Sequence, residues 1–192
     1  MSTAQGTGIP TGKYRIGPEQ GQLRLGTGTD GPMAAMGHHL ALQCERWEAV
    51  ITIADSLDDC RLDVTVDLTQ LSVIEGHGGP QPLTDKGRRD ILRNTARSLE
   101  SEQYPTLRFV ATGYQGRWDD GRVSGRMSVH GQTRQESFAV RIVDGDFRLS
   151  GSVTQTHYQI KPHSAMMGAL RVADEVTIEA RVPAAVLTEP SA

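Results

Sequence analysis

Six histidines are the side chains of this sequence best suited to bind a metal ion: His38, His39, His77, His130, His157 and His163. They form no His-x-His or Glu-x-x-His pair with zinc spacing. Neighbouring residues of a strand point to opposite faces, so His38 and His39 should not bind one ion together. A cluster of His39, His157 and His163 is the alternative, and it would indicate a metal-dependent enzyme. We favour surface or hydrogen-bonded histidines, and we predict neither a metal ion nor another cofactor.

The other residue types that carry catalysis are also sparse. Cys44 and Cys60 form no Cys-x-x-Cys pair and are too few for a disulfide framework, so we expect two reduced thiols. The sequence contains no Gly-x-Ser-x-Gly elbow, P-loop or dinucleotide fingerprint. We therefore predict a protein that is not an enzyme.

Charge and hydropathy exclude further classes of function. The 20 Lys and Arg residues against 23 Asp and Glu give a formal charge of −3, which argues against nucleic acid as a partner. No segment approaches the ~18 apolar residues of a membrane span, and the first residues lack the pattern of a signal peptide. We expect a cytoplasmic protein. A basic stripe at Lys86, Arg89, Arg93 and Arg97 could steer an anionic headgroup, although a solvated helix face is the favoured interpretation.

Alternation of polar and apolar residues dominates the chain and predicts antiparallel strands. Apolar residues take every second position of residues 61–71, at Leu62, Val64, Val66 and Leu68. Similar patterns occupy residues 22–27, 39–44, 47–53, 107–111, 122–129, 137–153 and 174–182. The Asp120-Gly121 and Asp144-Gly145 pairs predict hairpin turns. About eight strands follow, nearly all with a single apolar face.

A single amphipathic helix is predicted over residues 84–101, with Thr84 or Asp85 as its N-cap. Its apolar stripe consists of Ile91, Leu92, Thr95, Ala96 and Leu99. One helix of about four turns cannot cover eight strands, so the sheet must curl and bury its apolar face against itself. The fold class is therefore all-β, an antiparallel barrel of about eight strands with one helix.

The interior of such a barrel is either filled by side chains or holds one small ligand. Only 5% of the residues are aromatic, and small residues are expected at four inward positions, Ala111, Gly125, Gly151 and Ala180. We expect them to leave an apolar cavity, which is costly unless an apolar guest occupies it. The alternative is a filled core, which would indicate a structural or interaction module.

The stretch KPHSAMMGAL, residues 161–170, lies between the last two predicted strands. We expect Ser164 to cap a short helical turn there, bearing Met166, Met167 and Leu170. Methionine is flexible and polarizable, so it adapts well to flexible apolar ligands. Ordinary core packing under a crossover loop is an equally good interpretation.

The segment YPTLRFVATGYQGRWDDGRVSGRMSVHGQTR, residues 104–134, resembles the centre of the YceI-like family. Members carry Tyr-Pro before a strand, a variable hairpin, and then Gly-x-Leu-x-Ile-x-Gly-x-Thr-Arg or a close variant. The matching residues are Tyr104, Pro105, Phe109, Gly125, Met127, Val129, Gly131, Thr133 and Arg134. With the preceding helix and the closing strands, the similarity covers about residues 14–183.

The resemblance implies a lipocalin-like barrel with a long apolar tunnel and no catalytic residues. It also implies binding of a polyisoprenoid or similar amphiphile, such as a quinone or prenyl chain. We accordingly predict a non-catalytic binding or carrier protein. The residues predicted to contact the ligand are Phe109, Met127, Phe138, Phe147, Met166, Met167, Leu170, Ile178, His39 and Tyr158.

The ends of the chain are rich in small and polar residues. We expect a flexible segment over residues 1–12, the barrel domain over residues 13–184 and a flexible tail over residues 185–192. Edge strands of an incompletely closed barrel can pair between subunits, so a homodimer is a further expectation.

Overall fold

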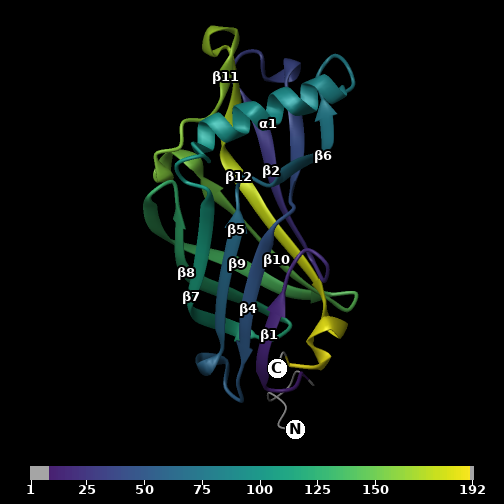
Figure 1. Ribbon diagram of the computed structural model, residues 1–192, viewed down its shortest axis with the longest axis vertical. Helices are drawn as coiled ribbons and strands as arrows, with labels where there is room; N and C mark the ends of the chain where they lie inside the picture. Colours follow the sequence, from purple (N-terminus) through teal and green to yellow (C-terminus); the bar gives the residue numbers. More distant parts are fainter. Residues whose placement is uncertain (1–8, 191–192) are drawn as a thin grey trace.

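The computed structural model describes residues 9–190, which form one curled antiparallel sheet crossed by the helix α1, Asp85–Leu99 (Figure 1). The strands are β1 Gly12–Ile16, β2 Gln22–Asp30, β3 His38–Cys44, β4 Trp47–Ile53, β5 Arg61–Asp67, β6 Leu71–Gly78, β7 Thr106–Arg117, β8 Asp120–Val129, β9 Gln132–Val143, β10 Asp146–Thr154, β11 Ser164–Ala165 and β12 Leu170–Pro183. The 3-10 turns are η1 Ala34–Met36, η2 Leu57–Asp59, η3 Gln155–Tyr158, η4 Met166–Gly168 and η5 Ala184–Thr188. The predicted all-β barrel with one helix is confirmed.

The sheet closes into a ring of long strands. Three of these long strands are interrupted, and each consists of two successive strands, β1 with β2, β3 with β4, and β5 with β6. β1 pairs with β4 while β2 pairs with β3, and β5 pairs with β4 while β6 pairs with β3. The interruptions lie at residues 17–21, 45–46 and 68–70, so the eleven strands of the main path make eight long ones. Since β12 pairs with β2, the path returns to its first long strand. The expected number of strands is therefore met.

Helix α1 crosses the end of the barrel where the ring is least complete (Figure 1). β5 pairs with β7, whereas β6 pairs with β3 alone among the described strands. Arg88 of α1 donates a hydrogen bond from Nη1 to the Val73 carbonyl on this unpaired edge, at 2.6 Å. The predicted cap is confirmed, because the Thr84 hydroxyl accepts from the Gly87 amide at 3.1 Å. The helix thus covers an edge that would otherwise expose backbone groups.

Two inward glycines make room for aromatic rings instead of leaving empty space. A Cβ on Gly125 would lie 2.7 Å from Phe109 Cζ, and one on Gly151 would lie 2.6 Å from Phe138 Cδ1. The two rings meet edge to face, with centroids 5.3 Å apart and planes at 82°. The expectation that these glycines leave space unfilled was wrong, because the rings lie against the backbone there.

One of the two predicted hairpin turns lies where it was predicted, and the other is shifted along the chain. Asp144 and Gly145 form the turn between β9 and β10 with φ of 54° and 81°, as a two-residue hairpin turn requires. The other turn lies two residues earlier than predicted, at Trp118 and Asp119, since Arg117 pairs with Asp120 across the hairpin. Arg117 also binds the Asp119 carboxylate through two hydrogen bonds, of 2.9 and 2.8 Å.

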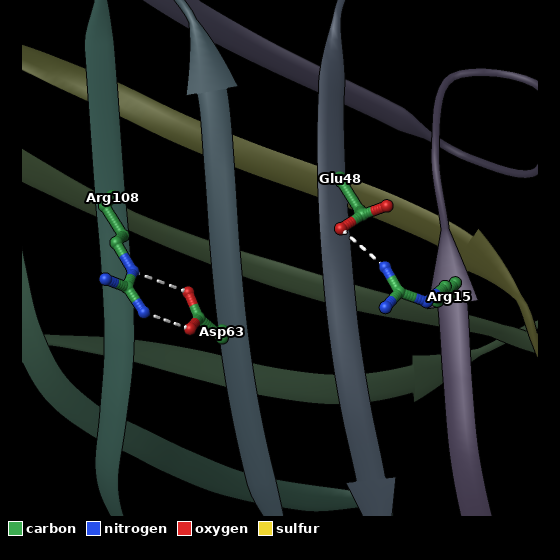
Figure 2. Close-up of polar contacts among 4 residues, drawn as sticks. All are labelled: Arg15, Glu48, Asp63 and Arg108. Carbon is green, nitrogen blue, oxygen red and sulfur yellow. Dashed lines mark hydrogen bonds and ion pairs between the residues drawn. The ribbon is translucent and has the colours of Figure 1, made fainter.

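The outer face of the barrel carries ion pairs between neighbouring strands (Figure 2). Arg108 of β7 donates two hydrogen bonds to the Asp63 carboxylate of β5, at 3.0 and 2.6 Å. Arg15 of β1 binds Glu48 of β4 at 3.0 Å. The bond from Arg108 lowers the pKa of Asp63 below its ordinary value. These pairs mark the wet face predicted from the alternation.

Packed residues extend into both segments that the sequence predicted to be flexible. Ile9 and Leu187 are buried in the core, and the Tyr14 hydroxyl donates to the Pro10 carbonyl at 2.6 Å. Residues 1–8 and 191–192 of those segments lie outside the described residues. The flexibility of the two ends stays a prediction.

Replacing Gly125 by Ala should destabilise the barrel by about 2 kcal/mol, because overpacking forces the backbone and neighbouring rings to shift. The new Cβ would lie 2.8 Å from Ala111 Cα as well as against Phe109. Gly113 is the matched control, since a Cβ there meets nothing within 4 Å. Urea unfolding should show a change within about 0.5 kcal/mol for Gly113→Ala. Equal losses in the two variants would contradict this packing.

Replacing Asp63 by Asn should lower the free energy of unfolding by about 0.5 kcal/mol at neutral pH, a small effect because both partners are exposed to solvent. A carboxyl group whose pKa is lowered by folding stabilises the protein above its ordinary pKa, and this contribution is lost as the pH falls through the lowered value. The difference between wild type and variant should therefore vanish in strong acid. A difference that grows on acidification would refute the role of the pair.

Candidate ligand-binding site

The inward faces of the strands enclose an apolar cavity of about 750 Å³. Its walls come from β2, β3, β4, β5, β7, β8, β9, β10 and β12, and include Leu23, Ile51, Val123, Phe147 and Val182. Most of the lining residues alternate along their strands, so the cavity follows from the same period-two pattern that built the sheet. The volume lies within the range of about 300–1,000 Å³ that is typical of small-molecule sites.

A smaller cavity of about 150 Å³ lies beneath α1. Ile91 and Leu99 of the helix face Leu40, Val129 and Val153 of the strands across it. The two cavities are adjacent, because both are lined by Leu25, Leu68, Leu107, Met127 and Ile178.

The larger cavity reaches the end of the barrel opposite α1. Leu57, Asp58, Tyr114 and Trp118 line both this cavity and a surface recess beside it. Arg61 and Arg148 also lie on the wall. The mouth is therefore polar and charged, while the depth of the cavity is apolar.

Two buried polar atoms of lining residues have no hydrogen-bond partner in the described structure, Nε1 of Trp47 at the larger cavity and Oγ1 of Thr27 at the smaller one. Leaving such a group unpaired costs about 1–3 kcal/mol. Neither atom is open to the cavity in this conformation, so a small side-chain rotation would be needed for it to meet a polar group there.

Comparison with known proteins assigns the family. The sequence profile of the YceI-like domain matches residues 14–184. The chain belongs to the YceI-like family. No curated protein is a significant match to the sequence. BcnA of Burkholderia cenocepacia is similar in structure, with a TM-score of 0.63 and 12% identity over 84% of this chain and 94% of BcnA. The YCEI protein of Campylobacter jejuni gives a TM-score of 0.54 and 15% identity over 73% of this chain and 81% of its own.

The structure brings six of the ten predicted contact residues of this YceI-like chain to the cavities. Phe109, Phe138 and Phe147 line the larger cavity, Tyr158 lines the smaller one, and Met127 and Ile178 line both. Tyr158 is fully buried, and its hydroxyl donates to Glu136 Oε1 at 2.8 Å. Burial, followed by this bond, raises the pKa of Tyr158, so the phenol stays protonated. Contact of these residues with a ligand stays a prediction.

The other four predicted residues, His39, Met166, Met167 and Leu170, line neither cavity. Met166 and Met167 are 50% and 106% exposed, and both have positive φ, so their side chains face solvent from a turn with left-handed backbone. The expected cap by Ser164 was wrong, because Ser164 lies in β11 and Ala165 precedes the turn without a side-chain cap. These four residues therefore lie outside the walls of both cavities, and their contact with a ligand stays a prediction.

The histidine cluster considered from the sequence does not form. The described residues contain no group of three or more His, Cys, Asp or Glu side chains that could hold a metal ion. His130 instead packs against Tyr104, with ring centroids 4.7 Å apart, and its Nδ1 shares a hydrogen bond with the Tyr158 carbonyl at 3.1 Å. Residues 9–190 also contain no helix long and apolar enough to cross a membrane.

Several residues of the cavity walls are not among the ten predicted contact residues. Trp47 is buried on the wall of the larger cavity, and Leu25, Leu68 and Leu107 separate the two spaces. All four lie in or beside predicted strands and share the face of the inward residues. The alternation had already placed Leu68 on the apolar face of its strand, and the same pattern would have selected all four as contact residues.

The two thiols should differ in reactivity toward a thiol-specific reagent in the folded protein. Cys44 is 0% exposed, and burial raises its pKa to about 12, whereas Cys60 is partly exposed on the cavity wall. Because the thiolate is the reactive form, Cys60 should be modified first and Cys44 only after unfolding. Mass spectrometry of labelled peptides measures this, with Cys60→Ser as the control. Rapid labelling of Cys44 in the folded protein would contradict the burial of this side chain.

Proposed function

We propose that this YceI-like chain is a non-catalytic binding or carrier protein that holds an isoprenoid, a quinone or a similar amphiphilic lipid inside its barrel. The observation that carries the proposal is the apolar cavity of about 750 Å³, with a second space of about 150 Å³ in line beneath α1. A dry space of this size loses packing contacts unless an apolar guest fills it. The guest has to be elongated, because the two spaces lie one after the other.

Burial of apolar surface would supply the affinity. At about 25 cal/mol per Å², a hydrocarbon chain that buries about 200 Å² gains about 5 kcal/mol before the cost of ordering it. The aliphatic walls offer little directional bonding, so chain length and flexibility should matter more than exact shape.

A polar end on the ligand is supported by the mouth of the larger cavity, where Asp58, Arg61 and Arg148 lie on the wall. Apolar pockets with a few polar groups at one end are typical of sites that fix the orientation of an amphiphile. The unpaired Nε1 of Trp47 is a further donor for a carbonyl or hydroxyl oxygen, once its ring has rotated.

The alternatives have less support. A metal-dependent enzyme would need the histidine cluster that the described residues lack, and a purely structural module would need a filled core where the larger cavity lies. A cytoplasmic location stays part of the proposal. A homodimer also stays part of the proposal. Pairing between subunits at the free edge of β6 would have to displace Arg88, which already donates to the Val73 carbonyl there.

Filling the cavity should abolish binding. Ala180 lies on the cavity wall between Leu149 and Leu23 of the neighbouring strands, so Ala180→Phe would occupy ligand space. We expect at least tenfold weaker binding of a prenyl alcohol or a ubiquinone, measured by equilibrium titration of lipid-free protein.

The matched control is Ala139→Phe. Ala139 lies between the lining residues Phe138 and Val140 and so points to the outer face of β9. This variant should bind like wild type. Equal binding by all three proteins, or no binding by any of them, would overturn the proposed function.

A further inference from the structure

Four of the five exposed large apolar side chains of the described residues lie together at one end of the barrel. Met33 and Met36 lie at η1, and Met166 and Met167 form part of η4; the fifth, Ile142, lies on β9. The Met33 amide donates to the Ala169 carbonyl at 2.9 Å, and Arg171 binds Asp30 at 3.0 Å, so the two segments are held side by side. Met167, the most exposed of the four, has positive φ, which costs energy for any residue other than glycine.

The loop before α1 joins the same surface. His38, two residues after Met36, shares a hydrogen bond from Nε2 with the Gln81 carbonyl at 2.9 Å, which places the start of the helix beside η1. We call residues 30–38, 79–93 and 161–171 together the methionine tip. Figure 1 shows β11 and the loops around it projecting beyond α1 at this end.

The methionine tip is basic, although the whole chain carries a formal charge of −3. It contains six basic residues against three acidic ones, a net charge of +3. Two acids are neutralised in ion pairs, Asp30 with Arg171 and Asp90 with Arg93, while Lys86, Arg89 and Lys161 form no ion pair within the described residues.

The opposite end of the barrel has the reverse charge. Residues 54–61, 116–121 and 141–148 contain seven acidic residues against four basic ones, a net charge of −3. The recess there is lined by Asp55, Asp58 and Asp119. An anionic surface would therefore attract the methionine tip and repel the other end.

The smaller cavity comes to the surface at the tip. His163 is exposed and lines this cavity, and it lies three residues before Met166. Exposed flexible apolar side chains surrounded by Lys and Arg are the combination that binds the interface of an anionic bilayer.

We propose that the methionine tip docks on the surface of an anionic lipid bilayer, with its methionines inserted among the headgroups and Lys86, Arg89 and Lys161 close to the lipid phosphates. Docking would set the opening at His163 against the membrane, from which a lipid could enter the smaller cavity. This loading step rests on the proposed function, whereas docking itself does not.

The test is co-sedimentation of lipid-free protein with vesicles of phosphatidylcholine, either alone or mixed three to one with phosphatidylglycerol. Wild type should bind the anionic vesicles at least tenfold more tightly and should release them at high salt. Met166→Ser combined with Met167→Ser should weaken binding at least fivefold, and Lys86→Glu combined with Arg89→Glu at least tenfold. Circular dichroism checks that each variant is folded.

Ile142→Ser and Lys13→Glu are the matched controls, because they remove an exposed apolar side chain and an exposed cation elsewhere on the barrel. Both should bind vesicles like wild type. Docking is overturned if wild type does not bind anionic vesicles, or if the tip variants bind them as tightly as wild type does. It is also overturned if the tip substitutions weaken self-association or binding to another protein while vesicle binding stays unchanged. Prenyl-alcohol titration of the same folded variants separates the two proposals, since a tip variant that still binds lipid leaves the proposed function intact.

Discussion

Closure of the sheet, through the pairing of β12 with β2, is the constraint on which the rest of this structure depends. Nearly every strand has one apolar face, and one helix cannot cover eight long strands, so the apolar faces can leave water only by facing each other. The three interrupted strands let the ring bend sharply while the hydrogen-bonded path stays continuous. Where the ring is least complete, α1 lies over the edge of β6 and roofs the smaller cavity.

Closing a ring of this size creates an interior that its own side chains do not fill. The chain has only three phenylalanines, and two of them, Phe109 and Phe138, pack edge to face with each other and lie against Gly125 and Gly151 of neighbouring strands. The remaining walls are mostly aliphatic, and they leave about 750 Å³ in the larger space. Membership of the YceI-like family and the likeness to BcnA agree on the barrel, while the ligand has to be inferred from the cavity itself.

Period-two alternation predicted most of this fold, because it reports directly which face of a strand is dry. It identified the inward positions of β5, β7, β8 and β12, and with them Phe109, Met127 and Ile178. It missed β1, which has only two buried residues, Tyr14 and Ile16, and much of β6, whose glycine-rich end reads as a loop. A closed barrel was predicted, but the strand pair that closes it was not, because the pairing between β2 and β12 joins opposite ends of the chain.

The candidate site was harder to predict than the fold. The exposure of Met166 and Met167 depends on left-handed backbone conformations that a sequence pattern does not reveal. The division of the interior by Leu25, Leu68 and Leu107 depends on side chains from distant strands. The exposure of the methionines and the division of the interior both arise from the three-dimensional arrangement, so a sequence pattern could not predict them.

The central claim is that the barrel shelters an elongated lipid. Native mass spectrometry of freshly isolated protein tests it most directly, because it reports any bound mass together with the mass of the chain. We predict a population whose excess mass is released on unfolding as an extractable amphiphile with a long apolar chain. A protein that carries no excess mass, and gains none when incubated with prenyl alcohols or quinones, would contradict the account.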